Sequence, residues 1–533
     1  MTAVAPEIES AGTARPRTFL PILAIALTMA ASLAVGAAAA QQPVIAVVGV
    51  LALLGAVAVA IRPEVAVLIV VALIYSNAPV VLSQFHDVPL AIAASVPLIL
   101  AAPLAYDILV RRKKIVLTPA MPWIAAFLVI QIVSTISARD TTDAVSSLST
   151  FLGEGIGLYV LITNTIRSTE VLRAVVWVLL LVGAFLGGLS FFQEITQTYG
   201  TSYFGFAQTE AAATGVTETG LARLAGPIGE KNRYAQIMLM LVPLALLQIS
   251  AERSRLLKVA ALGCAALAAI AIALTFSRGA ALAAGIIVIA MVALRYIRLN
   301  HLVAAAALVA LVLIAVPAYG ERLTSLADLG ALLSDEPAGS ATDNSLLSRA
   351  TENLTALRVF ADHPILGVGP GQFPNYYRDY ADEIGVSVRA ADRQAHNLYL
   401  GIAAETGILG LTAFLGAVAV TLFQLARARA RALASRPDLA AMAAGFMLAL
   451  VGYLASGLFL HLSYARYFWL VLALAGVAAA VILQATAKGT DDAATPRREP
   501  PRAERERREL LVVAEDVHDE MGLAGRGLVD PAE

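Results

Sequence analysis

The chain has few charged residues and almost no cysteine. Only 14% of its 533 residues are charged, whereas 59% are hydrophobic and the mean hydropathy is +0.76. A soluble globular domain is closer to half apolar and a quarter charged, so these proportions exclude an ordinary soluble protein. The single cysteine, Cys264, excludes disulfide bonds within the chain and metal sites built from clustered cysteines.

What the chain has instead is a series of long apolar runs. A helix needs about 20 apolar residues to cross the hydrocarbon core of a bilayer. The runs therefore predict an all-α, polytopic integral membrane protein with about 14 transmembrane helices. The predicted spans are residues 18–40, 43–61, 64–82, 88–110, 119–137, 150–166, 171–193, 232–250, 256–275, 279–297, 301–319, 397–425, 438–460 and 464–487.

The basic residues are unevenly shared between the two sides that this topology defines. With the N-terminus in the cytoplasm, the inner loops and tails hold 26 of the 38 Lys and Arg residues. Basic residues concentrate on the cytoplasmic side of membrane proteins. The bias therefore favours a multi-pass protein of the cell (cytoplasmic) membrane with both termini inside.

The spans divide the chain into five parts. We predict a cytoplasmic N-terminus (1–17), N-terminal helices (18–193), a core (194–425), C-terminal helices (426–487) and a disordered cytoplasmic tail (488–533). The core carries two long outer loops, 194–231 and 320–395. In the second loop we expect a short amphipathic helix on the outer surface, because apolar residues recur there at helical spacing. These residues are Leu347, Ala350, Leu354, Leu357 and Ala361.

Four polar motifs fall at the outer ends of the predicted spans, at 223–233, 275–279, 363–373 and 396–407. Arginine offers a planar fork of donors suited to phosphate. Histidine, with an ordinary pKa near 6.5, can accept a proton from a hydroxyl nucleophile. Their convergence on one side predicts group transfer from a lipid-linked phosphate donor. The candidate site residues are Arg223, Asn232, Ser277, Arg278, His396, Asn397, Tyr399 and Glu405.

Each candidate also has a structural explanation. Arg278 could extend to the membrane interface, Arg223 could be a solvated loop charge, and His396 could be satisfied by the backbone at a helix start. The segment 367–371 is more typical of a turn than of a phosphate cradle. Glu405 lies within a span, where ionisable residues are costly and usually functional, but it could simply hold a neighbouring helix. His461 and Arg466 flank the last outer turn and could join the site.

Taken in order, with a long outer loop among them, the motifs resemble the O-antigen ligase and O-antigen polymerase (Wzy-type) superfamily of bacterial envelope glycan enzymes. The resemblance covers roughly residues 222–410. It implies that Arg223 and Arg278 bind the donor diphosphate and that His396 acts as a base or orients the acceptor. One departure is that Glu230 and Lys231 stand before Asn232, where the family often has a proline.

The resemblance implies a glycosyltransferase of cell-envelope polysaccharide biosynthesis. Such an enzyme moves a glycan from undecaprenyl diphosphate to an acceptor hydroxyl at the outer face, without metal or other cofactor. Its partners would be the lipid-linked donor, a glycan or lipid acceptor and the membrane, with no nucleic acid. The role predicted for five residues is to bind substrate: Asn232, Ser277, Asn397, Tyr399 and Glu405.

Four alternatives stay open at this point. A Wzy-type polymerase would use the same donor and the same motifs, and a protein-glycosylating enzyme would share these motifs too. A small-anion transporter would need ionisable or broken-helix sites near mid-membrane, and few such charges occur here, Glu154 and Glu405 being the exceptions. A metal-dependent enzyme using polyprenyl-phosphate sugars would need a carboxylate in the first outer loop, which here holds only Gln41, Gln42 and their neighbours.

Overall fold

The computed structural model describes residues 64–89, 96–210, 222–298, 344–384, 393–462 and 464–494, with a few isolated residues besides. The chain divides into two compact units, Met1–Leu483 and Gln484–Glu533. Apart from the end of α21 and the predicted tail, the features discussed below belong to the first unit. Its described part is helical apart from one short antiparallel pair, β1 (Gln208–Thr209) with β2 (Leu224–Gly226).

Seven described helices are long and apolar enough to cross a membrane. A further pair, α3 (Val65–Tyr75) and α4 (Ala78–Phe85), is bent by 54° and would make an eighth span if counted as one. The seven are the continuous helix Thr141–Thr165, α10 (Thr169–Thr196), α12 (Lys231–Ala251), α13 (Arg255–Leu274), α19 (Leu398–Ala432), α20 (Pro437–Ser456) and the 465–487 part of α21 (Ala465–Ala494).

Shorter elements account for three more of the predicted spans. They are η1 (Val96–Leu100) with α6 (Ala101–Leu109), α7 (Met121–Ser134) with η2 (Thr135–Ser137), and α14 (Arg278–Ala293). The all-α polytopic architecture is thus confirmed. The number fourteen stays a prediction, because the spans at 18–40 and 301–319 and most of 43–61 lie outside the described residues. The predicted tail also lies outside them from residue 495 onward, and α21 continues to Ala494.

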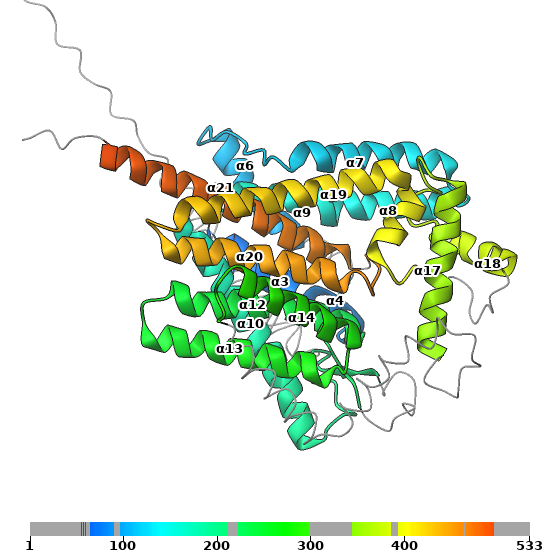
Figure 1. Cartoon of the computed structure of the whole chain (residues 1–533), viewed down its shortest axis with the longest axis horizontal. Coiled ribbons are helices and arrows are strands. Elements are labelled where there is room, and N and C mark those ends of the chain that lie inside the picture. The colour runs from blue at the N-terminus through cyan, green and yellow to red at the C-terminus, as the bar shows by residue number, and fades with distance from the viewer. Residues whose placement is uncertain are drawn as a thin grey trace, which may run out of the picture. The chain divides into compact units, whose positions relative to one another are not determined.

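The helices α12 and α20 lie side by side at the centre of the bundle, and nearly every residue of α20 is buried (Figure 1). Small residues permit this close approach. A Cβ on Gly183 of α10 would lie 2.0 Å from Leu241 of α12, and one on Gly452 of α20 would lie 2.7 Å from Ile287 of α14. The alanine- and glycine-rich composition therefore determines how tightly the spans pack.

The predicted sixth span, 150–166, begins earlier than its hydropathy indicated. The helix starts at Thr141, because Asp140 accepts the backbone N–H groups of Thr142 and Asp143 as an N-cap. It passes from α8 (Thr141–Thr150) through a π-helical turn, η3 (Phe151–Gly157), into α9 (Leu158–Thr165). A π-helical turn widens a helix and is often found at functional sites.

Two shorter helices, α17 (Asn344–Asp362) and α18 (Phe373–Glu383), pack together, and α17 also packs on α19 (Figure 1). We call this the loop end of the bundle; α12, α14 and α19 begin there. A helix, α17, is present where apolar spacing predicts one, and its placement on the outer surface stays a prediction. Two of its spaced apolar residues, Leu354 and Leu357, are about half exposed, while Glu352 and Thr355 are fully buried.

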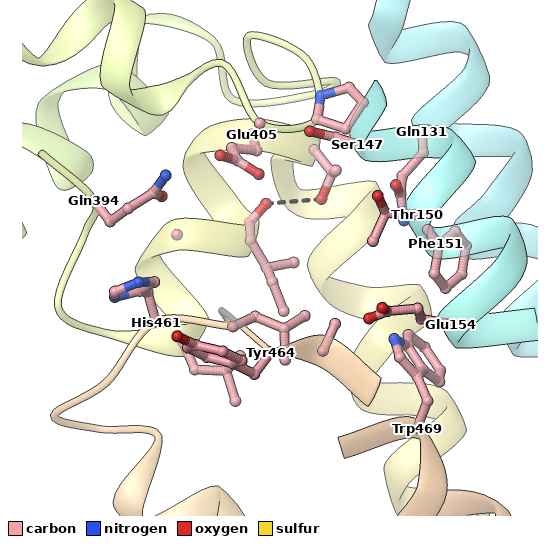
Figure 2. A pocket seen from close by; sticks show the side chains of 18 of the residues that line it. Gln131, Ser147, Thr150, Phe151, Glu154, Gln394, Glu405, His461, Tyr464 and Trp469 are labelled. Carbon is pink, nitrogen blue, oxygen red and sulfur yellow. Dashed lines mark hydrogen bonds between the residues drawn. The ribbon is translucent and has the colours of Figure 1, made fainter. Parts of the chain in front are cut away.

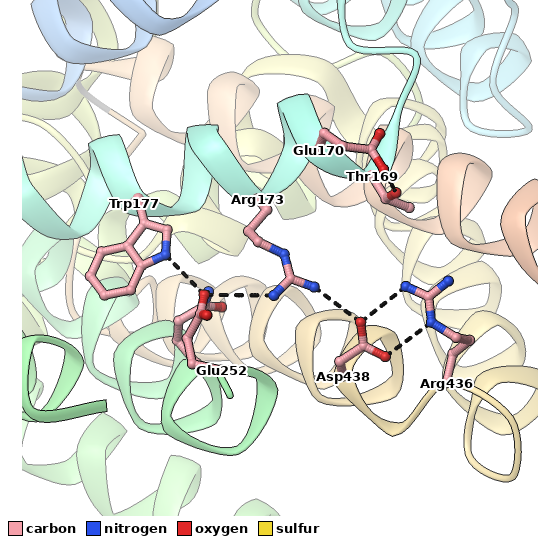
Figure 3. Close-up of polar contacts among 8 residues, drawn as sticks. Thr169, Glu170, Arg173, Trp177, Glu252, Arg436 and Asp438 are labelled. Carbon is pink, nitrogen blue, oxygen red and sulfur yellow. Dashed lines mark hydrogen bonds and ion pairs between the residues drawn. The ribbon is translucent and has the colours of Figure 1, made fainter. Parts of the chain in front are cut away.

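The opposite end of the bundle is joined by a chain of ion pairs (Figure 3). Arg173 of α10 contacts Glu252, just after α12, at 3.6 Å and Asp438 of α20 at 3.0 Å. The indole of Trp177 donates to Glu252 at 3.0 Å, and Arg436 pairs with Asp438 at 3.0 Å. These contacts link three helices and satisfy the nearly buried carboxylate of Glu252.

Candidate functional site

The helix α19 is broken one-third of the way along, at Gly407, where φ is +65°. The break frees backbone groups that the segment 364–369 satisfies. Val368 donates its N–H to the carbonyl of Ala404 at 3.0 Å, and Gly369 donates to that of Glu405 at 2.9 Å. In return, Ile408 donates to the carbonyl of Pro364 at 2.8 Å. The motif 363–373 therefore forms a clasp on the broken helix.

Glycine is required on both sides of this clasp. A Cβ on Gly367 (φ +68°) would lie 2.3 Å from the backbone of Glu405, and one on Gly407 would lie 2.1 Å from the carbonyl of Ile365. Positive φ angles at Gly369 and Gly371 complete a tight turn. The structure thus supports the interpretation of 367–371 as a turn, with its backbone donors directed at α19 rather than at a ligand.

The first two turns of α19 are fixed at their start as well. Asn397 caps the helix by accepting the N–H groups of Tyr399 and Leu400, and its amide donates to the carbonyl of Leu458 at 3.2 Å. The hydroxyl of Tyr399 donates to the carbonyl of Leu454 at 2.8 Å. Asn397 and Tyr399 thus hold α19 against the end of α20, and their predicted role in substrate binding stays a prediction.

His396 lies directly before this cap and contacts a residue that the sequence did not single out. Its Nδ1 lies against the carboxylate of Glu352, which is fully buried in α17. The other oxygen of Glu352 accepts from Arg393 at 3.3 Å. The imidazole is therefore oriented by a buried carboxylate, as in catalytic and metal-binding histidines, and not by the backbone of its own helix.

A second imidazole, that of His461, lies edge-on to His396, with ring centroids 5.6 Å apart. His461 comes from the connection between α20 and α21. Burial, together with the nearby charge of Arg233, lowers the pKa of His461 to about 2. The ring is therefore neutral at physiological pH, so it adds no charge beside His396. The sequence indicated His461 only as a residue flanking the last outer turn.

Arg278 begins α14 beside a polar contact between two of the predicted motifs. Ser277 caps α14 and donates its hydroxyl to Asn232 at 2.8 Å. The amide of Asn232 in turn donates to Glu230 at 2.9 Å. The carboxylate of Glu230 also caps α12 by accepting the N–H groups of Asn232 and Arg233. The departure from the family pattern at Glu230 thus has a structural reason, because this residue starts the helix.

Arg349 of α17 lies between the Asn232–Ser277 contact and the carboxylate of Glu352 that touches His396. The motifs in the sequence did not indicate this arginine. It lines a small space together with Asn232 and Ser277. Burial lowers the pKa of Arg349, and the adjacent charge of Arg278 lowers it further. Arg349 stands one helical turn before Glu352, so the same face of α17 carries both the guanidinium and the carboxylate that orients His396.

Arg223 lies beside this group, close to Lys231. Both cations pair with Glu210, Arg223 at 3.8 Å and Lys231 at 2.5 Å. The hairpin of β1 and β2 brings Glu210 to Arg223, whose carbonyl accepts the N–H of Glu210. We call Arg223, Lys231, Arg233, Arg278, Arg349 and Arg393 the cationic cluster; its carboxylates are Glu210, Glu230 and Glu352. Among the described residues, six cations and three carboxylates gather here, a composition that suits an anion with several charges.

A cavity of about 400 Å³ lies next to His461. Residues of α7, the helix Thr141–Thr165, α19 and α21 contribute to its wall (Figure 2). Glu405 lines it, with its carboxylate near the backbone N–H of Phe373. The last predicted site residue is therefore close to the histidine pair but separate from the cationic cluster. Arg466 also lines the cavity, where it pairs with Glu154 at 3.4 Å.

Comparison with known protein families identifies residues 263–415 as an O-antigen ligase domain. The match runs from α13 into α19 and includes Ser277, Arg278, His396 and Glu405, whereas Arg223 precedes it. No curated protein matches the chain significantly. The resemblance inferred from the motifs is thus confirmed for this part of the chain, and the match supports a ligase- or polymerase-type function in polysaccharide biosynthesis.

Proposed function

We propose that this chain, a member of the O-antigen ligase family by its residues 263–415, transfers a glycan from undecaprenyl diphosphate to an acceptor hydroxyl. The observation that carries the proposal is the position of His396 beside the cationic cluster, with its Nδ1 held by Glu352. A base beside an anion site is the arrangement that transfer from a diphosphate-linked donor requires.

The chemistry would proceed as one displacement at the anomeric carbon. The acceptor oxygen forms a bond to that carbon while the bond to the phosphate oxygen breaks, and the leaving lipid diphosphate keeps the electron pair. His396 takes the acceptor proton on Nε2, because Nδ1 is committed to Glu352. Arg278 and Arg349, supported by Arg223, stabilise the charge that develops on the diphosphate.

We place the loop end on the outer side of the cell membrane. The opposite end of the bundle carries the clusters of basic residues after α6, α9, α12, α14 and α19, which are typical of cytoplasmic loops. Both termini are then cytoplasmic, and the cationic cluster faces the side on which lipid-linked glycans are assembled into polymers.

A polymerase would use the same donor, and the geometry of the cationic cluster suits both reactions. Transport of a small anion is less favoured. A transporter fold uses broken helices whose freed backbone groups contact the substrate, and α19 is broken at Gly407. The freed groups of Ala404, Glu405 and Ile408 are instead paired with the segment 364–369.

The glycan and lipid profile of a deletion strain tests this function. We expect undecaprenyl-diphosphate-linked glycan to accumulate, and complementation with the wild-type chain, but not with Arg278→Ala, to relieve it. A long accumulated glycan would identify a ligase and a single repeat unit a polymerase. An unchanged profile, in a strain without a second such enzyme, would contradict the proposal and favour transport.

A further inference from the structure

We infer that the cavity beside His461 binds uncharged sugar rings of the acceptor, and that the donor diphosphate lies on the other side of the histidine pair. The inference rests on the proposed function and adds to it the position and chemistry of the second substrate. It depends on where the cavity opens, on the charge of its wall and on the polar groups that face it.

The cavity and the cationic cluster meet at the two histidines. His461 lines the cavity, and its ring is in edge-on contact with that of His396. Glu352, which orients His396, lies one turn of α17 from Arg349, which lines the small space beside Ser277. An acceptor hydroxyl in the cavity near His461 would therefore approach His396 from the cavity, whereas the donor diphosphate would lie at the arginines.

The wall of the cavity has the wrong charge for a diphosphate. Besides His461 and Tyr464, its ionisable side chains are Glu154, Glu405 and Arg466, and Arg466 is already paired with Glu154 at 3.4 Å. The lining residues therefore include no cation without a carboxylate partner, so this wall does not attract a polyanion. The six cations of the cationic cluster do the opposite. The two sides of the histidine pair thus differ in the charge of the substrate that each can hold.

Buried polar groups face the cavity. Gln131 of α7 is 6% exposed and lines the cavity. The indole N–H of Trp469, which also lines it, is buried and has no hydrogen-bond partner among the described residues. Buried donors and acceptors are nearly always paired in proteins, so an unpaired donor of this kind indicates a ligand that accepts the hydrogen bond.

The polar groups Gln131, Thr150 and Glu154 lie on one wall of the cavity together with the aromatic rings of Phe151 and Trp469. Figure 2 shows Gln131, Thr150, Phe151, Glu154 and Trp469 following one another along that wall. The π-helical turn η3 contains Phe151 and Glu154 and so contributes both to the wall. Amide and hydroxyl groups beside aromatic rings suit a ligand with polar edges and apolar faces, as sugar rings have.

The size of the cavity agrees with such a ligand. Pockets for small molecules enclose about 300–1,000 Å³, and this one measures about 400 Å³. Because α7, α19, α21 and the helix Thr141–Thr165 supply most of its wall, the cavity would select the acceptor by shape and by hydrogen bonds to its hydroxyl groups. We therefore assign specificity for the acceptor to this wall.

Filling the cavity tests the inference. Thr150→Trp places a large ring at the wall, and Ser149→Trp, at the exposed neighbouring position that does not line the cavity, is the matched control. A second variant, Gln131→Leu, keeps the volume of the side chain and removes its polar atoms. The full-length proteins would be reconstituted in lipid vesicles with donor glycolipid from the deletion strain and with unmodified acceptor from that strain, each titrated separately.

We expect Thr150→Trp and Gln131→Leu to raise KM for the acceptor by about tenfold or more, while KM for the donor changes less than about twofold. Ser149→Trp should leave both values unchanged. A selective rise in KM for the donor, or unchanged kinetics of both cavity variants, would overturn the inference. Absence of transfer by the wild-type protein would instead reject the proposed function, which separates the two failures.

Discussion

The buried carboxylate of Glu352 lies against Nδ1 of His396, although the two residues belong to different helices. Glu352 is fully buried in α17 and is charge-balanced by Arg393 at 3.3 Å. Taking a carboxylate out of water is costly unless its partners are well placed. The arrangement therefore orients the ring of His396, with one nitrogen committed to Glu352 and the other available to a substrate.

Replacing Glu352 by glutamine should lower kcat by about a hundredfold or more, because an amide can present its NH₂ to the ring and favour the wrong tautomer. Steady-state rates, normalised to the amount of folded protein, measure this effect. A purely structural role would lower the amount of folded protein and leave the rate per folded molecule unchanged.

Arg349→Lys should reduce transfer by about tenfold or more, since a point charge cannot replace a planar fork of donors on phosphate. The matched control is Arg358→Lys on the same helix, because Arg358 is exposed and pairs with Asp362 and Glu383. Arg278→Lys should resemble Arg349→Lys. Equal activity of the Arg349 and Arg358 variants would remove Arg349 from the diphosphate site.

The clasp on α19 predicts a large effect of one methyl group. Gly367→Ala should destabilise the protein by about 2 kcal/mol or more, because its Cβ would overlap the backbone of Glu405 at a positive φ. Gly188→Ala in α10, where a Cβ would meet nothing within 4 Å, is the control and should be neutral or slightly stabilising. Thermal unfolding in detergent compares them. Equal stability of the two variants would show that the segment 364–369 can shift to accept the Cβ without loss of folding free energy.

The proposed orientation predicts opposite labelling of two exposed serines. In a Cys264→Ser background, Ser137→Cys at the loop end should react with an impermeant thiol reagent in intact cells. Ser254→Cys, just before α13 at the opposite end, should react only after the membrane is opened. The reverse pattern would place the cationic cluster in the cytoplasm and reject transfer at the outer face.

Span positions could be predicted from the sequence because a bilayer sets both length and hydropathy. The predicted 256–275 and 232–250 differ from α13 and α12 by about one residue at each end. The exception is instructive. The segment 141–150 is rich in Ser and Thr, so hydropathy could not include it, whereas the N-cap at Asp140 starts the helix there. Asp140 is a typical N-cap residue, so it could have predicted from the sequence that the helix starts at Thr141.

The site was only partly predictable. Arg278, Ser277 and Asn232 lie together as the motifs indicated, and His396 lies beside Arg349 through Glu352. Glu352 and Arg349 were missed because apolar spacing assigns the buried face of a helix to its hydrophobic residues. In α17 the buried face is mixed: Ala356 and Val359 pack in a hydrophobic cluster, and Glu352 is buried on the same helix. Only the contacts in three dimensions show that Glu352 and Arg349 lie beside the predicted site residues.

The position of the clasp along the chain has a consequence for biosynthesis. The arginine of α14 is synthesised long before His396, and the segment 364–369 must wait for α19 before its backbone groups find their partners. A nascent chain that has inserted its helices through α14 therefore contains Arg278 but not yet Glu352 or His396. Under the proposed function such a chain lacks the base, so transfer can begin only after the last third of the polypeptide has been synthesised.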